Sequence, residues 1–188
     1  MEAQLNGITL GVDVGDLTTQ AVDALVISAT IDFNPDLSTE LGRVVLQKAG
    51  PVLRAQMGAL PDAEIGDAVM TVAGNLPARH LIHAVCPTMG SGGERGKLAN
   101  TVWNVLRLAV DKQLRSITFT PLAIERFGYP IEGCATIMVQ KIVDFTFEDC
   151  GPLASIRICL ESAQTALFFD RALLREIDIA RREASTGG

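Results

Sequence analysis

The segment ALVISAT (residues 24–30) is a short, continuous run of apolar and small residues. Central strands of parallel sheets have this composition, because helices cover both faces of the sheet and leave no position that faces water. A second segment, SITFT (116–120), begins as a buried strand and leads into the turn PLAIERFGYP (121–130). Both segments are predicted to be strands, so we expect the core to form around a sheet that is covered on both sides.

Strands and helices alternate along the rest of the chain. The further strands are predicted at ITLGVDV (8–14), DAVMTVAG (67–74), RHLIHAVCP (79–87) and SIRICLE (155–161), and the helices at 40–50, 51–59, 94–113, 130–145 and 163–182. This alternation predicts an α/β fold with helices on both faces of a mostly parallel sheet. We expect a single domain over residues 1–188, with its core at about 8–182 and a frayed tail at 183–188.

The helix at 40–50 directly follows the loop after ALVISAT. Ser38 or Thr39 is expected to cap its N-terminus through the side-chain hydroxyl. At helical spacing, one face of this helix carries Leu41, Val44, Val45 and Lys48.

The overall charge argues against several classes of partner. The chain has a net charge of −6 and a pI of about 4.9, and it has no long basic run of the kind that neutralises nucleic-acid phosphates. It also has no apolar stretch of about 18 residues, the length of a membrane span, and no signal-peptide pattern at its N-terminus. We therefore expect a cytoplasmic protein whose partners include neither nucleic acid nor a membrane. The sequence leaves its oligomeric state open.

The cysteines and histidines do not form a recognisable metal or catalytic set. The cysteines are widely spaced, at Cys86, Cys134, Cys150 and Cys159. His80 and His83 lie at an odd spacing on a predicted strand, so their side chains point to opposite faces of the sheet. We predict buried, reduced thiols, an interior His83, no metal site and no catalytic residue.

Ligands of parallel sheets bind beyond the carboxyl ends of the strands. The ends of ALVISAT, SITFTPL and SIRICLE are therefore candidate sites. Asp13 and Asp16 flank Gly15 just after the first strand. An aspartate at such a position can accept a hydrogen bond from an exocyclic amine such as that of adenine, or it can cap its own turn. Both interpretations of Asp16 are open at this point.

Three segments in this order resemble the macro domain family, whose members bind ADP-ribose. They are GDLTTQAVDALV (15–26), LPARHLIHAVCP (76–87) and SITF…FGYP (116–130), with helices between them. The resemblance extends from about Gly15 to Leu173. It implies a three-layer α/β/α sandwich with a mixed, mostly parallel sheet of about six strands. It also implies ADP-ribose as a ligand and no required cofactor.

The resemblance assigns roles at the first two strand ends. Asp16 matches the family aspartate that accepts a hydrogen bond from the adenine amino group, and Leu17 matches its neighbour in that pocket. Thr30 replaces an asparagine that contacts the distal ribose and serves catalysis in hydrolytic members. The glycine-rich stretch that normally follows is NPDLSTELGR (34–43) here, and only Gly42 is left of its glycines.

The second phosphate-binding loop is also altered. The family often has Ser-(Thr/Ser)-Gly-(Ile/Val)-(Tyr/Phe)-Gly-Tyr-Pro where this chain has AIERFGYP (123–130). Glu125 takes the place of the first glycine, and Glu161 takes the place of an aromatic residue at the end of the last strand. A diphosphate near Glu125 is expected to experience a repulsion of about 1–4 kcal/mol. The resemblance therefore implies a macro fold with a rebuilt, divergent pocket.

Three functions follow from these residues. We favour a non-catalytic binding module for ADP-ribose, a related nucleotide or an ADP-ribosylated protein. Its expected contacts are Asp16, Leu17, Thr30, Gly42, Arg126, Phe127 and Gly128. The alternative is a scaffold or protein-interaction domain that offers the apolar loop TPLAI (120–124) to a partner. A third hypothesis, less favoured, is an ADP-ribosyl hydrolase that uses Thr30, Asp36 or Glu40.

Overall fold

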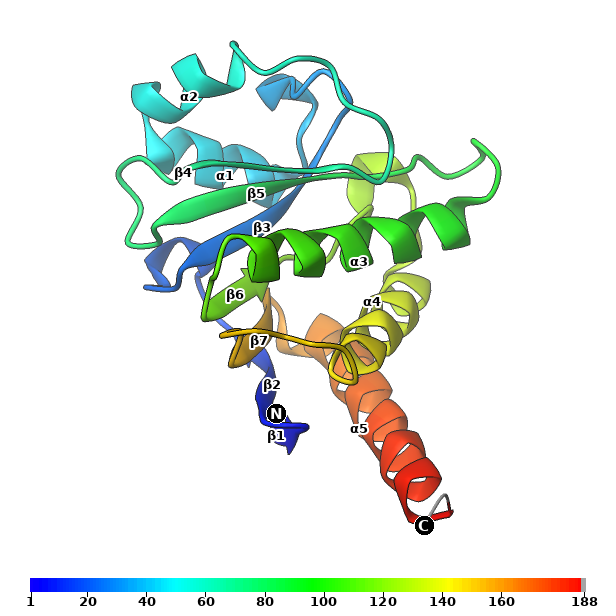
Figure 1. Cartoon of the computed structure of the whole chain (residues 1–188). Coiled ribbons are helices and arrows are strands. Elements are labelled where there is room, and N and C mark those ends of the chain that lie inside the picture. The colour runs from blue at the N-terminus through cyan, green and yellow to red at the C-terminus, as the bar shows by residue number, and fades with distance from the viewer. Residues whose placement is uncertain (187–188) are drawn as a thin grey trace.

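The computed structural model describes residues 1–186, which form a mixed seven-stranded sheet between two layers of helices (Figure 1). The strands are β1 (Glu2–Leu5), β2 (Ile8–Val14), β3 (Ala24–Ala29), β4 (Ala68–Val72), β5 (His80–Val85), β6 (Ser116–Phe119) and β7 (Ser155–Leu160). Their order across the sheet is β1-β2-β7-β6-β3-β5-β4. The two edge strands are antiparallel to their neighbours and the inner strands are parallel. This architecture confirms the expected α/β/α sandwich.

The helices divide between the two faces of the sheet. They are α1 (Glu40–Ala49), α2 (Pro51–Met57), α3 (Glu94–Asp111), α4 (Ile131–Phe145) and α5 (Ala163–Thr186). Helices α1 and α2 cover one face, and α3, α4 and α5 cover the other (Figure 1). Of the tail expected to fray at 183–188, the part up to Thr186 is helical, and residues 187–188 lie outside the described range.

Strand β3 is buried along its whole length, as its composition predicts. Leu25 and Ile27 pack in the cluster under α1 and α2, whereas Ala24 and Val26 pack in the cluster under α3 and α4. Both sets are excluded from water, so no position in the strand can carry a charged side chain without a large desolvation cost. The one polar side chain of β3 is that of Ser28, next to its last residue, and its hydroxyl oxygen accepts from the Ala123 amide at 3.2 Å.

Strand β1 is the element that the sequence analysis missed. Its residues EAQL are few and mostly polar, because β1 is an edge strand and, in the described chain, neither β1 nor β2 contributes to the core cluster under α1 and α2. On that face the Arg157 side chain lies across Gly11 of β2, where a Cβ atom would be 2.8 Å from the Arg157 Cζ. Arg157 also donates hydrogen bonds to Asp13 on β2 and Glu2 on β1. Ion pairs thus replace a helix as the cover of this face.

Helix α1 is rotated by about one residue from the orientation that its apolar pattern suggests. Thr39 caps it, as expected, by accepting a hydrogen bond from the Gly42 amide. The buried residues are Gly42, Val45, Leu46 and Ala49. Val44 and Lys48, expected to share a face with Leu41 and Val45, are exposed. Leu41 is left half-buried beside a surface cavity.

His83 is an interior histidine, as predicted. Its side chain is fully buried on β5, and its Nε2 atom lies 2.8 Å from the Thr71 hydroxyl of β4. Burial disfavours the charged form and lowers the pKa of His83 to about 4. The imidazole is therefore neutral in the folded protein at physiological pH.

The neutral state of His83 makes stability depend on pH. The unfolded chain binds a proton near the ordinary value of 6.5, whereas the folded protein binds it only near 4. Between these values the unfolded state holds more protons, so stability falls as pH falls. From pH 7.5 to pH 5 the wild type should lose about 2 kcal/mol more unfolding free energy than His83→Gln, measured by urea denaturation. An equal loss in both proteins would contradict this account.

The Arg157 ion pair predicts a second pH effect. Arg157 donates from Nε and Nη2 to the Asp13 carboxylate at 2.5 and 2.6 Å, which lowers the pKa of Asp13 below its ordinary value of 3.8. The stabilisation is therefore present above that value and is lost as pH falls through the lowered pKa. Asp13→Asn should cost about 1–3 kcal/mol at pH 7, and this difference should shrink below pH 3.8.

Glu2→Gln is the control for that measurement. Glu2 contacts the same arginine from a more exposed position, with a single bond of 2.8 Å. Its loss should cost at most about 1 kcal/mol at neutral pH. A larger effect from Glu2→Gln than from Asp13→Asn would show that the outer pair, and not the two-bond inner pair, covers this face.

Candidate functional site

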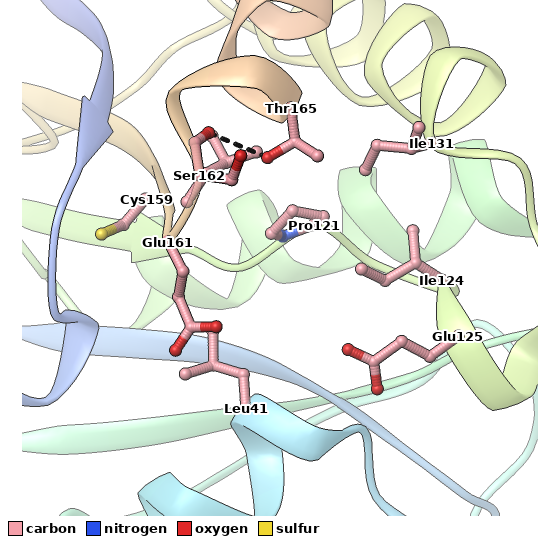
Figure 2. A pocket seen from close by; sticks show the side chains of 10 residues that line it. Leu41, Pro121, Ile124, Glu125, Ile131, Cys159, Glu161, Ser162 and Thr165 are labelled. Atoms are coloured by element: carbon pink, nitrogen blue, oxygen red, sulfur yellow. Dashed lines mark hydrogen bonds between the residues drawn. The ribbon is translucent and has the colours of Figure 1, made fainter.

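A cavity of about 200 Å³ opens beyond the carboxyl ends of β6 and β7, opposite the start of α1 (Figure 2). It is lined by Leu41, Pro121, Ile124, Glu125, Ile131, Cys159, Leu160, Glu161, Ser162 and Thr165. Two other cavities, of about 200 and 240 Å³, lie against α1 and α2 and against α4 and α5. We consider the first cavity the candidate site, because ligands of parallel sheets bind at strand ends and not on outer helix surfaces.

The walls of this cavity are mainly apolar. Leu41 comes from α1, Pro121 and Ile124 from the loop after β6, and Ile131 from the first turn of α4. Polar groups come from the start of α5, where the Thr165 hydroxyl donates to the Ser162 carbonyl at 2.9 Å. Apolar walls with a few polar groups suit a ring system that carries hydroxyls.

Two carboxylates, Glu125 and Glu161, approach the cavity from opposite sides (Figure 2). Within the described chain, no lysine or arginine is among the residues that line it. The wall of the cavity is therefore negative, and it does not offer a cation to a ligand phosphate.

The Glu125 carboxylate connects two walls of the cavity. The Glu40 amide, the first of α1, donates to Glu125 Oε2 at 2.6 Å. Glu125 holds this position with a φ angle of +55°, and Ala123 in the same loop has a φ of +58°. The left-handed region costs a residue with a Cβ atom about 1–2 kcal/mol, which is why glycine is usual there. The loop thus stores strain at the residue that contacts α1.

Asp16 caps the 3-10 helix Leu17–Thr19 that follows β2. Its Oδ1 atom accepts from the Thr18 amide at 2.8 Å and from the Thr18 hydroxyl at 2.6 Å, and Lys48 of α1 lies 3.2 Å from Oδ2. The hydrogen bonds from Thr18, with Lys48 beside them, lower the pKa of Asp16. Asp16 is exposed, so its carboxylate is ionised, fixed in orientation and accessible to a ligand amine.

The end of β3 is occupied by contacts within its own loop. The Thr30 hydroxyl donates to Asp32 Oδ1 at 2.6 Å, and the Asn34 amide donates to the same oxygen at 3.2 Å. These bonds lower the pKa of Asp32, the Thr30 bond most strongly. Farther along, a Cβ atom at Gly42 would lie 2.0 Å from Ser38 Oγ. Gly42 therefore has a packing role at the first turn of α1.

None of the seven residues predicted to contact a ligand is among those that line the cavity in the described chain. Leu17 and Phe127 are buried in the two core clusters. Gly128 ends a 3-10 turn with a φ of +80°, and Arg126 is exposed. Leu41 and Glu125, the chain neighbours of Gly42 and Arg126, line the cavity instead. The ligand contacts of the seven residues stay predictions.

The sequence analysis singled out Glu161 at the end of β7, which lines the cavity, but it missed the neighbouring residues of β7 and the contribution of α5. Cys159, Ser162 and Thr165 line the cavity from there, and Ile131 lines it from α4. A usable signal was present, because the end of SIRICLE had been identified as one of three candidate strand ends. The sequence pattern does not show which side chains near the end of this strand point into the cavity.

The cysteines are free, and Cys86, Cys134 and Cys159 are buried as predicted, whereas Cys150 is half-buried. Burial raises the pKa of the Cys86 and Cys159 thiols to about 11. These two thiols are protonated at neutral pH and are poor nucleophiles.

Residues 1–186 contain no group of three or more histidine, cysteine, aspartate or glutamate side chains that could hold a metal ion. No helix in the same range is long and apolar enough to cross a membrane.

Comparison with known proteins places this geometry in a family. The family model of the macro domain matches residues 36–138. The O-acetyl-ADP-ribose deacetylase of Klebsiella pneumoniae is 35% identical over 171 residues, which cover 85% of this chain and 93% of the relative. The protein of the same name from Escherichia coli K12 is 31% identical over 176 residues, with coverages of 87% and 94%.

Solved structures agree with the sequence relatives. The Oceanobacillus iheyensis macrodomain with ADP superposes with a TM-score of 0.85 at 27% identity, covering 95% of this chain and 96% of the other. A mutant of the same macrodomain with ADPR gives a TM-score of 0.86 at 26% identity, with coverages of 95% and 98%. Because the family model spans more than half of the chain and the relatives nearly all of it, the chain belongs to the macro domain family.

Proposed function

We propose that this protein is a binding module for ADP-ribose or a related nucleotide and that it does not hydrolyse its ligand. The observation that carries the proposal is the cavity of about 200 Å³ at the carboxyl ends of β6 and β7, with apolar walls and hydroxyl groups at one side. Its family membership supports the choice of ligand, and a relative of 27% identity has been solved with ADP.

The nucleoside half of the ligand fits the apolar part of the cavity. Leu41, Pro121 and Ile131 offer surfaces against which a base and its ribose can pack. Asp16 lies just outside this part of the cavity, because its neighbour Gly15 is bonded to two residues that line it. The Gly15 amide donates to the Leu160 carbonyl, and the Gly15 carbonyl accepts from the Cys159 thiol. Because Oδ1 already accepts two hydrogen bonds from Thr18, an exocyclic amine would bond to Oδ2 and share it with Lys48.

The groups near the end of β3 are poorly suited to catalysis. The hydroxyl of Thr30 is engaged by Asp32, and the lowered pKa of Asp32 keeps this carboxylate ionised at neutral pH. An ionised carboxylate cannot act as a general acid. The names of the relatives nevertheless make deacetylation of O-acetyl-ADP-ribose the second candidate function, with Asp32 as a candidate base beside the predicted Asp36 and Glu40.

The scaffold hypothesis loses its main support. It relied on the loop TPLAI (120–124) as an apolar surface for a partner. In the structure, residues 120–123 are buried and Ile124 is half-buried against the core. The loop is apolar because it packs inside this protein.

Calorimetry with ADP-ribose tests the binding function. We expect a dissociation constant in the micromolar range and a loss of about tenfold or more in affinity for Asp16→Ala. Asp149→Ala is the matched control, because Asp149 caps the Gly151 amide at 3.0 Å in the same way, before the start of β7 and thus at the opposite end of the sheet. Absence of binding at millimolar ligand would refute the function, and equal losses in both variants would remove Asp16 from the site.

An acetate-release assay tests the claim that the module is not catalytic. The wild type should release acetate from O-acetyl-ADP-ribose no faster than buffer does, because Thr30 and Asp32 bond to each other. Release that disappears in Asp32→Asn, while ADP-ribose binding persists, would establish the deacetylase function in place of the binding module.

A further inference from the structure

Among the described residues that line the cavity, Glu125 is the one whose side chain bonds to the first amide of α1. Its backbone belongs to the 3-10 turn Glu125–Phe127 after β6, whereas the amide that it accepts from, that of Glu40, begins α1. The contact therefore joins two segments that are 85 residues apart in sequence, beside the cavity that Glu125 lines.

The bond places a negative group of the protein itself beside α1. The first amides of a helix have no partners within the helix and attract anions. In α1 the Thr39 hydroxyl serves the Gly42 amide, and the Glu125 carboxylate serves the Glu40 amide. An anionic ligand group that approaches this wall meets a carboxylate and an amide that is already bonded.

The second acidic residue of the cavity has a different arrangement. Glu161 lines the opposite wall and extends from the end of β7 (Figure 2). Glu161 contributes negative charge to the cavity. Glu125 contributes negative charge and also accepts the hydrogen bond of the Glu40 amide. Comparing the two residues separates two effects on an anionic ligand. Glu161 can only repel the ligand, whereas Glu125 can repel it and also occupies the Glu40 amide.

We propose that Glu125 determines ligand specificity by acting as a built-in competitor of a ligand's phosphate groups. The cavity accepts an uncharged nucleoside while the Glu125–Glu40 contact is intact. A nucleoside diphosphate such as ADP-ribose must first displace the carboxylate, so its affinity is reduced by the cost of breaking the contact. The identity of the ligand rests on the proposed function, but the competition at the Glu40 amide does not.

Affinities for a charged and an uncharged ligand test this proposal. Glu125→Gly removes the carboxylate and fits the φ of +55° without strain. It should raise the affinity for ADP-ribose by about tenfold or more, and change that for adenosine by less than about twofold, in calorimetry. Glu125→Gln keeps an oxygen for the Glu40 amide without the charge, and it should give an intermediate gain.

Glu161→Gln is the matched control, because it removes one charge from the cavity and leaves the Glu40 amide occupied. Its gain in ADP-ribose affinity should stay below about threefold. Equal gains in ADP-ribose affinity for Glu161→Gln and Glu125→Gly would show that only the negative charge of the cavity matters and that the bond between Glu125 and the Glu40 amide has no effect on binding. No gain for Glu125→Gly, in a protein that binds ADP-ribose, would also overturn the proposal.

A measurement without the nucleotide separates this proposal from the proposed function. In NMR spectra, titration with inorganic pyrophosphate should shift the Glu40 amide of Glu125→Gly and leave that of the wild type unchanged. If ADP-ribose binds to neither protein, the proposed function fails, but the pyrophosphate result still decides the role of Glu125. Equal shifts in both proteins, or no shift in either, would overturn that role.

Discussion

Burial of β3 on both faces is the constraint on which the rest of the structure depends. Because Leu25 and Ile27 pack toward α1 and α2 while Val26 packs toward α3 and α4, this inner strand has no room for a charged side chain along its length. Hydrogen-bonding groups that can meet a ligand are then found where strands end and loops begin. The cavity beyond β6 and β7 follows from this arrangement, and its floor is the edge of the same core.

The chemistry of the candidate site depends on side chains that bond within the protein. Glu125 keeps a left-handed backbone that glycine would adopt without strain, and it uses this position to bond the first amide of α1. Thr30 and Asp32 similarly satisfy each other at the end of β3. Of these contacts, the one made by Glu125 lies at the cavity, and the apolar walls formed by Leu41, Pro121 and Ile131 remain open to a ligand.

The sequence predicted the parts of this structure that depend on periodicity and missed those that depend on local geometry. The alternation of strands and helices, the interior position of His83 and the cap at Thr39 are confirmed. Strand β1 was missed because its pattern is short and polar where Arg157 covers the sheet. Glu125 was identified as unusual from its type, but the direction of its carboxylate depends on a backbone angle that no residue pattern encodes.

A crystal structure of the protein with ADP-ribose tests the central claim most directly, since it shows the ligand and Glu125 together. The account predicts the nucleoside packed against Leu41, Pro121 and Ile131, with the Glu125 carboxylate moved away from the Glu40 amide. A diphosphate bound beside α1 with the 2.6 Å contact still in place, or an empty cavity at saturating ligand, would contradict it.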